Sequence, residues 1–295
     1  MFERIIDISE EGASLSVNLD RLVIKRGAEQ TAIPLSEVAV LIVSNPAVWY
    51  TQAVLSGICK NGGIFILCNE KRMPIGMLLP LEQNYIQSER FARQASASLP
   101  TNKKLWKQII KAKVNHQGKL LKKIHNDDYG LCELAKKVRS GDASNIEAQA
   151  SKKYWRALYG ESFRRDFASQ GVNSLLNYGY AVLRALVTRA ICSVGLHPSI
   201  GLHHHNRYNP FCLADDLMEP FRPVVDEIVF AIAQERDNDI QLDRDLKGQL
   251  IAGISGRRFQ IDGENREMFD TLTRVASSLL SVYQGREKKL SLPEF

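Results

Sequence analysis

The sequence lacks the features of several specialised classes of protein. No uninterrupted apolar run among its 295 residues reaches the roughly 20 residues that a membrane-spanning helix requires. The first residues, Met-Phe-Glu-Arg-Ile-Ile-Asp, lack the basic and apolar regions of a secretory signal. No segment is repeated and none is of low complexity. We therefore expect an ordinary globular protein with no membrane partner.

Cysteine is sparse as well. The five cysteines are scattered, odd in number and without the spacing of a zinc site. This pattern is typical of reduced thiols, and it predicts a cytoplasmic protein. With 44% hydrophobic and 24% charged residues, the composition is that of a globular chain with room for two domains or one large one.

Acidic residues are missing from one long segment. Between Arg90 and Asn126 there is no Asp or Glu, and ten basic residues give the segment a charge of +10. Because the whole chain carries +6, the rest carries −4. Helical spacing with the apolar residues inward places these lysines outward: Lys104, Lys107, Lys111 and Lys122. A solvated lysine face is the simpler interpretation, but charge this concentrated favours contact with a polyanion such as a phosphate backbone.

Residues 1–82 are predicted to form a small β-rich domain. Short segments that mostly alternate, separated by turn signals, predict strands over residues 4–8, 14–18, 21–25, 30–33, 64–68 and 74–79. The continuous apolar run 38–43 predicts a central strand, and residues 49–59 have helical spacing. This half shows no catalytic constellation, so we expect it to be a packing or dimerisation scaffold.

Residues 83–295 are predicted to form a larger all-α domain, which makes the fold α+β. Residues 173–194 form a nearly all-round apolar helix that Gly195 caps. Pro220 and Pro223 must kink or restart the helix that contains them. Residues 224–235 and 264–284 also have helical spacing, 257–262 are ambiguous, and the tail from Gly285 is predicted to be mobile and basic.

The segment 201–223 gathers residue types that bind a cation. It holds three histidines and three acids: His203, His204, His205, Asp215, Asp216 and Glu219. On a helix, Glu219 shares a face with both aspartates, which precede it by three and four residues. Imidazole with carboxylate oxygens suits Mg²⁺ or Mn²⁺ when water fills the other positions. The sequence therefore predicts that these groups can face one cation.

A simpler interpretation exists for the same acids. Adjacent acids on a helix are usually solvated, and acids in a first turn complement the helix dipole. Apolar neighbours such as Leu217 and Phe221 indicate a largely buried helix instead. Buried carboxylates need a cation or a hydrogen-bond donor, which favours the cation site.

Glu147 is a further candidate carboxylate with a competing explanation. Ser144 precedes it by three residues, which is the spacing of a helix capping box, and the sequence by itself favours the cap. The alternative is a third metal carboxylate. Lys152 and Arg156 lie one or two turns further along, and Arg164 and Arg165 follow in a polar link, where they could contact phosphate.

Four segments, in this order, resemble the CRISPR-associated integrase, the subunit that inserts new spacers into a CRISPR array. They are NIEAQASKKYW at 145–155, NSLLNYGYA at 173–181, GLHPSIGLHH at 195–204 and LADDLMEPFRP at 213–223. The segment DLMEPFRP resembles the corresponding segment of the version found in type II systems. The resemblance covers the whole chain and implies a β-rich N-terminal domain with a helical catalytic and DNA-binding domain after it.

The resemblance implies a role for each matching residue. It assigns the metal ligands and catalytic groups to Glu147, His204 and Glu219, with Asp216 as a supporting acid, and so overrides the capping role of Glu147. The choice of His204 is open by one position within the triplet His203–His205. Many relatives have Gly and Asp where this chain has Ala148 and Glu219, and neither change removes a ligand.

The implied activity is a metal-dependent DNA integration, with Mg²⁺ or Mn²⁺ as cofactor. The 3′-hydroxyl ends of short foreign duplexes are joined to the repeat boundary by transesterification. Implied partners are double-stranded DNA, a second copy of the chain in a homodimer and a small second CRISPR adaptation protein, with the RNA-guided nuclease of the same system as a further candidate. The alternatives are a metal-dependent structure-selective nuclease of branched DNA and a non-catalytic basic nucleic-acid-binding scaffold. The candidate DNA contacts are Lys104, Lys107, Lys111, Lys152, Arg156, Arg164 and Arg165.

Overall fold

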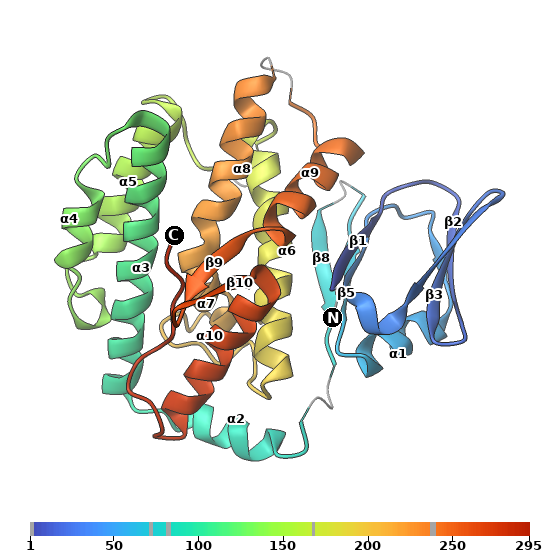
Figure 1. The fold of residues 1–295 in the computed structure, drawn as a ribbon, viewed down its shortest axis with the longest axis horizontal. Helices are drawn as coiled ribbons and strands as arrows, with labels where there is room; N and C mark the ends of the chain where they lie inside the picture. The colour runs from blue at the N-terminus through green and yellow to red at the C-terminus, as the bar shows by residue number, and fades with distance from the viewer. Residues whose placement is uncertain (1–2, 71–72, 81–83, 167–168, 237–239) are drawn as a thin grey trace.

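The chain has the predicted α+β fold, with β-strands first and a mostly helical part after them (Figure 1). The computed structural model describes residues 3–70, 73–80, 84–166, 169–236 and 240–295. The predicted domain boundary at residues 82 and 83 lies outside the described residues. Within the described residues, no helix is both long enough and apolar enough to span a membrane.

Two four-stranded sheets make up the N-terminal part. One has the order β1-β5-β7-β8 and the other β4-β3-β2-β6. The strand bounds are β1 Arg4–Ile8, β2 Ala13–Asn18, β3 Arg21–Arg26, β4 Glu29–Pro34, β5 Val38–Val43, β6 Trp49–Tyr50, β7 Ile64–Cys68 and β8 Pro74–Leu78. All seven predicted strands are confirmed to within one residue. The predicted helix at 49–59 is only partly correct, because Trp49–Tyr50 pairs with β2 and helix α1 covers Gln52–Lys60.

Strand β5 is buried on both faces, which explains the continuous apolar run. Leu41 and Val43 pack into a core between the two sheets. Val40 and Ile42 belong instead to the core of the helical part. A bulge at the start of β5, where Arg4 pairs with Val38 and Ile5 with Val40, accommodates the extra residue Ala39. The two parts of the chain therefore share one sheet.

Helix α6, Val172–Ser193, lies at the centre of the helical part (Figure 1). It packs against α7, α8, α9 and α10. Gly195 at φ 70° ends it as predicted, with the Leu196 N–H donating to the carbonyl of Ile191. The other helices are α2 Gln87–Ala95, α3 Leu99–His125, α4 Leu131–Lys136, α5 Ile146–Tyr159, α7 Cys212–Met218, α8 Arg222–Glu235, α9 Arg244–Ser255 and α10 Met268–Tyr283, with short 3₁₀ turns η1 Leu35–Glu37, η2 Ser140–Asp142 and η3 Glu219–Phe221.

Two expectations about the C-terminal end are wrong. Glu264–Glu267 is a strand, β10, that pairs with β9 at Arg258–Ile261, so the last long helix begins only at Met268. Alternating side chains with Asp262 and Gly263 at the turn explain the hairpin. The tail is also ordered. Leu290 is buried, the Glu294 N–H donates to Gln260, and the Phe295 ring stacks on His116.

A buried polar network joins the β-rich part to the helical part. The Lys247 ammonium on α9 lies 3.0 Å from Ser44 Oγ and 3.4 Å from Asp7 Oδ2. The Tyr178 hydroxyl on α6 donates to Asp7 Oδ2 over 2.5 Å. Only 2% of the Lys247 side chain and 8% of the Asp7 side chain are exposed. The carboxylate, the ammonium and the two hydroxyls are partners of one another, as a buried charged pair requires.

We predict that Lys247→Met lowers the free energy of unfolding by about 3 kcal/mol, because it leaves the Asp7 charge buried without its cation. Urea unfolding at pH 7 measures the change, with the exposed Lys137→Met as the matched control. A Lys247→Met protein as stable as the control would show that the network does not hold the two parts together.

Candidate functional site

An ammonium group lies between two carboxylates from different parts of the helical fold. Lys113 on α3 places its Nζ 2.7 Å from Glu147 Oε1 on α5 and 2.5 Å from Glu219 Oε2 at η3. Lys113 is buried, with 8% of the residue exposed. Burial opposes its charge, but Glu219 and Glu147 more than offset this and raise the pKa of the Lys113 ammonium.

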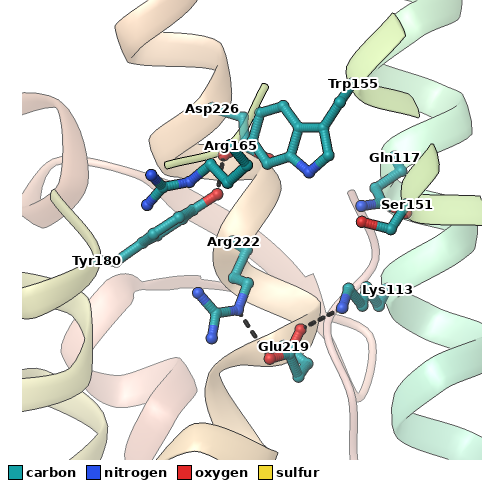
Figure 2. A pocket seen from close by; sticks show the side chains of 9 residues that line it. All are labelled: Lys113, Gln117, Ser151, Trp155, Arg165, Tyr180, Glu219, Arg222 and Asp226. Carbon is teal, nitrogen blue, oxygen red and sulfur yellow. Dashed lines mark hydrogen bonds and ion pairs between the residues drawn. The ribbon is translucent and has the colours of Figure 1, made fainter. Parts of the chain in front are cut away.

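Glu219 is held on two sides by cations. Figure 2 shows the Lys113 ammonium and the Arg222 guanidinium flanking its carboxylate. Arg222 Nε donates to Oε1 over 2.8 Å, whereas Oε2 has no well-oriented hydrogen bond and only the close Lys113 charge. Burial raises the pKa of this carboxyl, but Arg222 and Lys113 outweigh burial and lower the pKa to about 2. Glu219 is therefore ionised at neutral pH.

Glu147 does not cap its helix, so the capping-box prediction is wrong. Asp142 performs that function, because its two carboxylate oxygens accept the N–H groups of Ile146 and Glu147, each over 2.9 Å. Asn145, at the helix start, has a left-handed φ of 51° and makes no side-chain cap. The Glu147 carboxylate is left to face Lys113, with 27% of the side chain exposed.

Asp216 organises the histidine loop. It is fully buried and accepts backbone N–H groups from Leu202 over 2.6 Å and from His203 over 2.9 Å. Its Oδ1 lies 2.5 Å from His204 Nδ1. That hydrogen bond is the main reason that the pKa of His204 is raised, and the charges of Glu219 and Glu147 add to it. The bond occupies Nδ1 and leaves Nε2 as the ring nitrogen for a ligand or a proton.

The other two histidines of the triplet have different environments. The His203 ring stacks flat on Trp106, with centroids 4.3 Å apart and planes 3° apart. Burial lowers the pKa of His203. His205 is exposed. Of the three rings, that of His204 is the one that contacts Asp216.

The structure does not bring all three acids of the 201–223 segment to one point. Asp215 turns toward α6, where it accepts a hydrogen bond from Arg184 Nε over 2.7 Å, and it also accepts one from Asn209 Nδ2 over 2.7 Å. Asp216 is saturated by the histidine loop. Glu219 alone of the three faces Lys113 and Glu147, because the 3₁₀ turn at Pro220 changes the direction of the chain there.

The donor groups suit a divalent cation, but Lys113 stands between the carboxylates. In the described part of the chain, no three His, Cys, Asp or Glu side chains are arranged to hold a metal as they stand. Two carboxylates already converge on one cationic group, and Glu219 Oε2 is buried without a well-oriented donor. Mg²⁺ and Mn²⁺ bind carboxylate oxygens of this kind, and one imidazole can complete the ligand set. The residues therefore fit such an ion once the ammonium moves aside.

The sequence did not single out Lys113, and a signal for it was present. It is one of the ten basic residues of 90–126 and was not among the lysines predicted to point outward, and it follows Ile109 by four positions and Ile110 by three. A helix places it on the buried face with them. The lysines predicted to point outward are all exposed: Lys104, Lys107, Lys111 and Lys122. Of the other candidate DNA contacts, Lys152, Arg156 and Arg164 are exposed and Arg165 is half-buried.

His116 supports the turn that carries Glu219. It lies on α3, with 3% of the residue exposed, and its Nδ1 is 2.7 Å from the Pro220 carbonyl oxygen. The Phe295 ring stacks on it at 5.2 Å. Burial lowers the pKa of His116 to about 4. The neutral imidazole donates to the carbonyl and fixes the position of η3 against α3.

Fold and site together define a two-part protein whose helical part carries a glutamate pair, a histidine and exposed basic side chains. Residues 6–251 match the family described as CRISPR associated protein Cas1. The chain is 36% identical, over 97% of its length and 94% of the relative, to the CRISPR-associated endonuclease Cas1 of Neisseria meningitidis serogroup C. The chain belongs to the Cas1 family of CRISPR-associated endonucleases and integrases.

Solved structures share the fold at low sequence identity. A casposase bound to its integration product has a TM-score of 0.79 at 19% identity, over 99% of this chain and 93% of that one. A chain of a Cas6-RT-Cas1–Cas2 complex has a TM-score of 0.77 at 15% identity, over 97% of this chain and 35% of that one. At these identities the likeness establishes the fold.

We predict that His116 makes the protein less stable as the pH falls. The unfolded chain protonates His116 near pH 6.5 and the folded protein only near pH 4. Stability from this group is therefore complete above pH 6.5 and is lost as the pH falls toward 4. Between pH 7.5 and 5 the loss is about 2 kcal/mol. Between pH 7.5 and 5, the free energy of unfolding of His116→Gln, measured with urea, should therefore fall by about 2 kcal/mol less than that of wild type. The exposed His125→Gln should match wild type.

We also predict that Lys113→Met lowers the free energy of unfolding by about 3 kcal/mol in EDTA, because it leaves two carboxylates facing each other without their shared cation. Lys111→Met, an exposed lysine on the same helix, is the matched control. Added Mn²⁺ should raise the melting temperature of Lys113→Met more than that of wild type. Equal stability of the two variants in EDTA would contradict the bridging role of the ammonium.

Proposed function

We propose that this protein is the metal-dependent DNA integrase of CRISPR adaptation. It joins the 3′-hydroxyl ends of short foreign DNA duplexes to the boundary of a repeat by transesterification. The observation that carries the proposal is the convergence of Glu147 and Glu219, from separate helical segments, on one cation beside the His204 imidazole. The similarity to a casposase bound to an integration product supports it.

Glu147, His204 and Glu219 would hold the divalent ion. The bound ion would supply Lewis-acid stabilisation of the reacting phosphate and of the leaving oxygen. The attacking 3′-hydroxyl oxygen forms the new P–O bond, and the bond to the leaving 3′-oxygen breaks. One phosphodiester replaces another, so the step needs no ATP.

The neighbouring residues set the geometry and the proton path. Asp216 fixes Nδ1 of His204, so that Nε2 is the position that binds the ion or carries the proton from the attacking hydroxyl. Arg222 keeps Glu219 ionised and in place. His116 fixes the η3 backbone through Pro220. These contacts pre-organise the site, which is the main way a protein accelerates phosphoryl transfer.

The exposed basic residues would position the DNA backbone. Lys104, Lys107 and Lys111 lie on the outer face of α3, and Lys152 and Arg156 lie on α5 beyond Glu147. Such contacts are independent of base sequence and weaken with salt. Arg165 is half-buried, hydrogen-bonds Asn173 and Asn177, and lines a pocket beside Glu219, so its contribution is more local.

We further propose that residues 1–82 form a domain that pairs two copies of the chain, and that residues 83–295 form the catalytic and DNA-binding domain. A dimer of sites suits a reaction that joins two strand ends. The likeness to a chain of a complex that contains Cas1 and Cas2 supports a small second adaptation protein as partner. The RNA-guided nuclease of the same system is a further proposed partner.

We predict that the purified protein joins a short duplex with 3′-hydroxyl ends to a supercoiled plasmid that carries a repeat array, with Mg²⁺ or Mn²⁺ and the small partner. Glu147→Ala, His204→Ala and Glu219→Ala should each reduce joining by at least about a hundredfold, since each removes a ligand of the ion. The exposed Glu133→Ala on α4 should join like wild type. Gel analysis of covalent product measures all five proteins.

The same experiment separates the alternatives. Cleavage of branched or plasmid DNA without joining, with the partner present, would establish a nuclease that uses water as nucleophile at the same ligands. DNA binding with neither reaction in any condition would establish a scaffold, in which the two glutamates serve only to hold Lys113.

A further inference from the structure

Helix α3 presents one row of side chains to three different segments of the site. Trp106 and Lys113 are seven residues apart, which is about two helical turns, so they share a face of the helix, and His116 follows on the same side. Lys113 bridges the two glutamates, and His116 holds the turn that carries Glu219. Trp106 contacts the third segment, the loop with the three histidines.

Trp106 packs against two imidazole rings of that loop. Its indole lies flat on the His203 ring, with centroids 4.3 Å apart and planes 3° apart. The His204 ring stands at 86° to the indole, 5.5 Å away, and at 85° to the His203 ring, 5.4 Å away. Stacked and edge-to-face pairs are favourable arrangements of aromatic rings. We call the pair of Trp106 and His203, against which His204 rests, the aromatic corner.

Trp106 contributes its flat surface to the corner, and not its N–H group. Only 1% of the residue is exposed, and among the described residues its Nε1 has no hydrogen-bond partner. A buried donor without a partner costs about 1–3 kcal/mol, and a buried tryptophan usually has one. A phenylalanine ring would avoid that cost. The contact with two imidazoles is therefore the use of the indole that the structure shows.

Other groups fix the backbone of the loop. Asp216 accepts the N–H groups of Leu202 and His203, and the Leu202 side chain belongs to the core of the helical part. Gly201 lets the chain turn tightly, because a Cβ there would lie 2.3 Å from the His204 carbonyl oxygen. These contacts hold the main chain and leave the side-chain torsions of the two histidines to be set by their own neighbours.

The His204 ring needs more than one contact to keep its plane. The Asp216 carboxylate lies 2.5 Å from its Nδ1 and so fixes one atom of the ring. The core does not enclose the ring, since 43% of the side chain is exposed. The aromatic corner limits the remaining rotation from two sides. A metal ligand has to be held within about 0.5 Å of its productive position, and the hydrogen bond and the corner together hold Nε2 in this way.

We propose that Trp106 and His203 are positioning residues for the His204 imidazole, and that His203 is not itself a ligand of the ion. The inference rests on the proposed function, which makes His204 a ligand of Mg²⁺ or Mn²⁺. It assigns different roles to two adjacent histidines. His203 acts through its flat ring, and His204 acts through its nitrogen.

Binding of Mn²⁺ without DNA, measured by calorimetry, tests the proposal. His203→Ala should weaken binding about tenfold, the effect of losing a contact that orients a metal ligand. His203→Phe keeps a ring on the indole but has no nitrogen, so it should bind within about threefold of wild type. Tyr208→Ala removes an exposed aromatic side chain of the same loop and should bind like wild type.

Trp106 tests the same contact from its other side. Trp106→Phe retains a flat ring and should keep most of the affinity for Mn²⁺, whereas Trp106→Leu should weaken it as much as His203→Ala does. The double variant with Trp106→Leu and His203→Ala should lose about tenfold in all and not about a hundredfold, because both substitutions remove one contact. Since Trp106 belongs to the core, the variants of exposed His203 decide the question if Trp106→Leu does not fold.

Two further measurements separate positioning from a structural role. In EDTA, His203→Ala should melt close to wild type, because the residue is exposed. In the joining reaction it should lower kcat and leave the KM for DNA unchanged, since the corner orients a ligand of the ion and does not hold DNA. A much lower melting temperature of His203→Ala in EDTA would show that the contact serves stability, and would overturn the proposal.

The Mn²⁺ titrations also distinguish this inference from the proposed function. Wild-type affinity in His203→Ala, with weakened binding in His204→Ala, overturns the aromatic corner and leaves the ligand set standing. Equal losses in His203→Phe and His203→Ala overturn it too, because they make the imidazole nitrogen the group that matters. Wild-type affinity in His204→Ala overturns the ligand set itself, and this inference with it.

Discussion

The Lys113 ammonium between Glu147 and Glu219 determines how the helical part can be built. It ties α3 to α5 and to the turn at η3, three segments that are remote in sequence. Two carboxylates this close cannot both remain charged in a buried place without a cation between them. The Arg222 guanidinium adds a second positive charge beside Glu219. The hydrogen bond from His116 to the Pro220 carbonyl holds the turn that carries Glu219 in place. A site that needs a cation to be stable is also a site that can exchange one cation for another.

Around this centre, two further acids, Asp216 and Asp142, hold neighbouring backbone groups in place by hydrogen bonds. Asp216 accepts backbone N–H groups and holds one histidine ring by one nitrogen. Asp142 takes over the cap of α5 and so frees Glu147. In both cases an acid with a purely structural function lets a neighbouring side chain face the site. Acids that bind backbone and acids that bind a cation are neighbours in the sequence, as Asp216 and Glu219 are, and residue type alone does not distinguish them.

Sequence patterns predicted much of the fold for identifiable reasons. The β-strands followed from alternation and turn residues, and the end of α6 followed from Gly195, because those signals are local. The order of the tail was missed, since it depends on contacts with Gln260, His116 and Ser278 that no local pattern encodes. The β9–β10 hairpin was missed although its turn residues, Asp262 and Gly263, are a local signal. Glu147, His204 and Glu219 were found through family motifs. Lys113 was missed because its place in a long basic segment concealed that it lies on the apolar face of α3.

The shared sheet has a consequence for how the protein unfolds. Val40, Ile42, Ile64 and Ile66 belong to the core of the helical part, although they lie in strands of the N-terminal part. If the helices separated from the sheet, these side chains would meet water, and the central strands would lose one of their two covered faces. The two parts are therefore expected to melt in a single cooperative transition. A load applied to the outer sheet would reach α6 and α9 through this face.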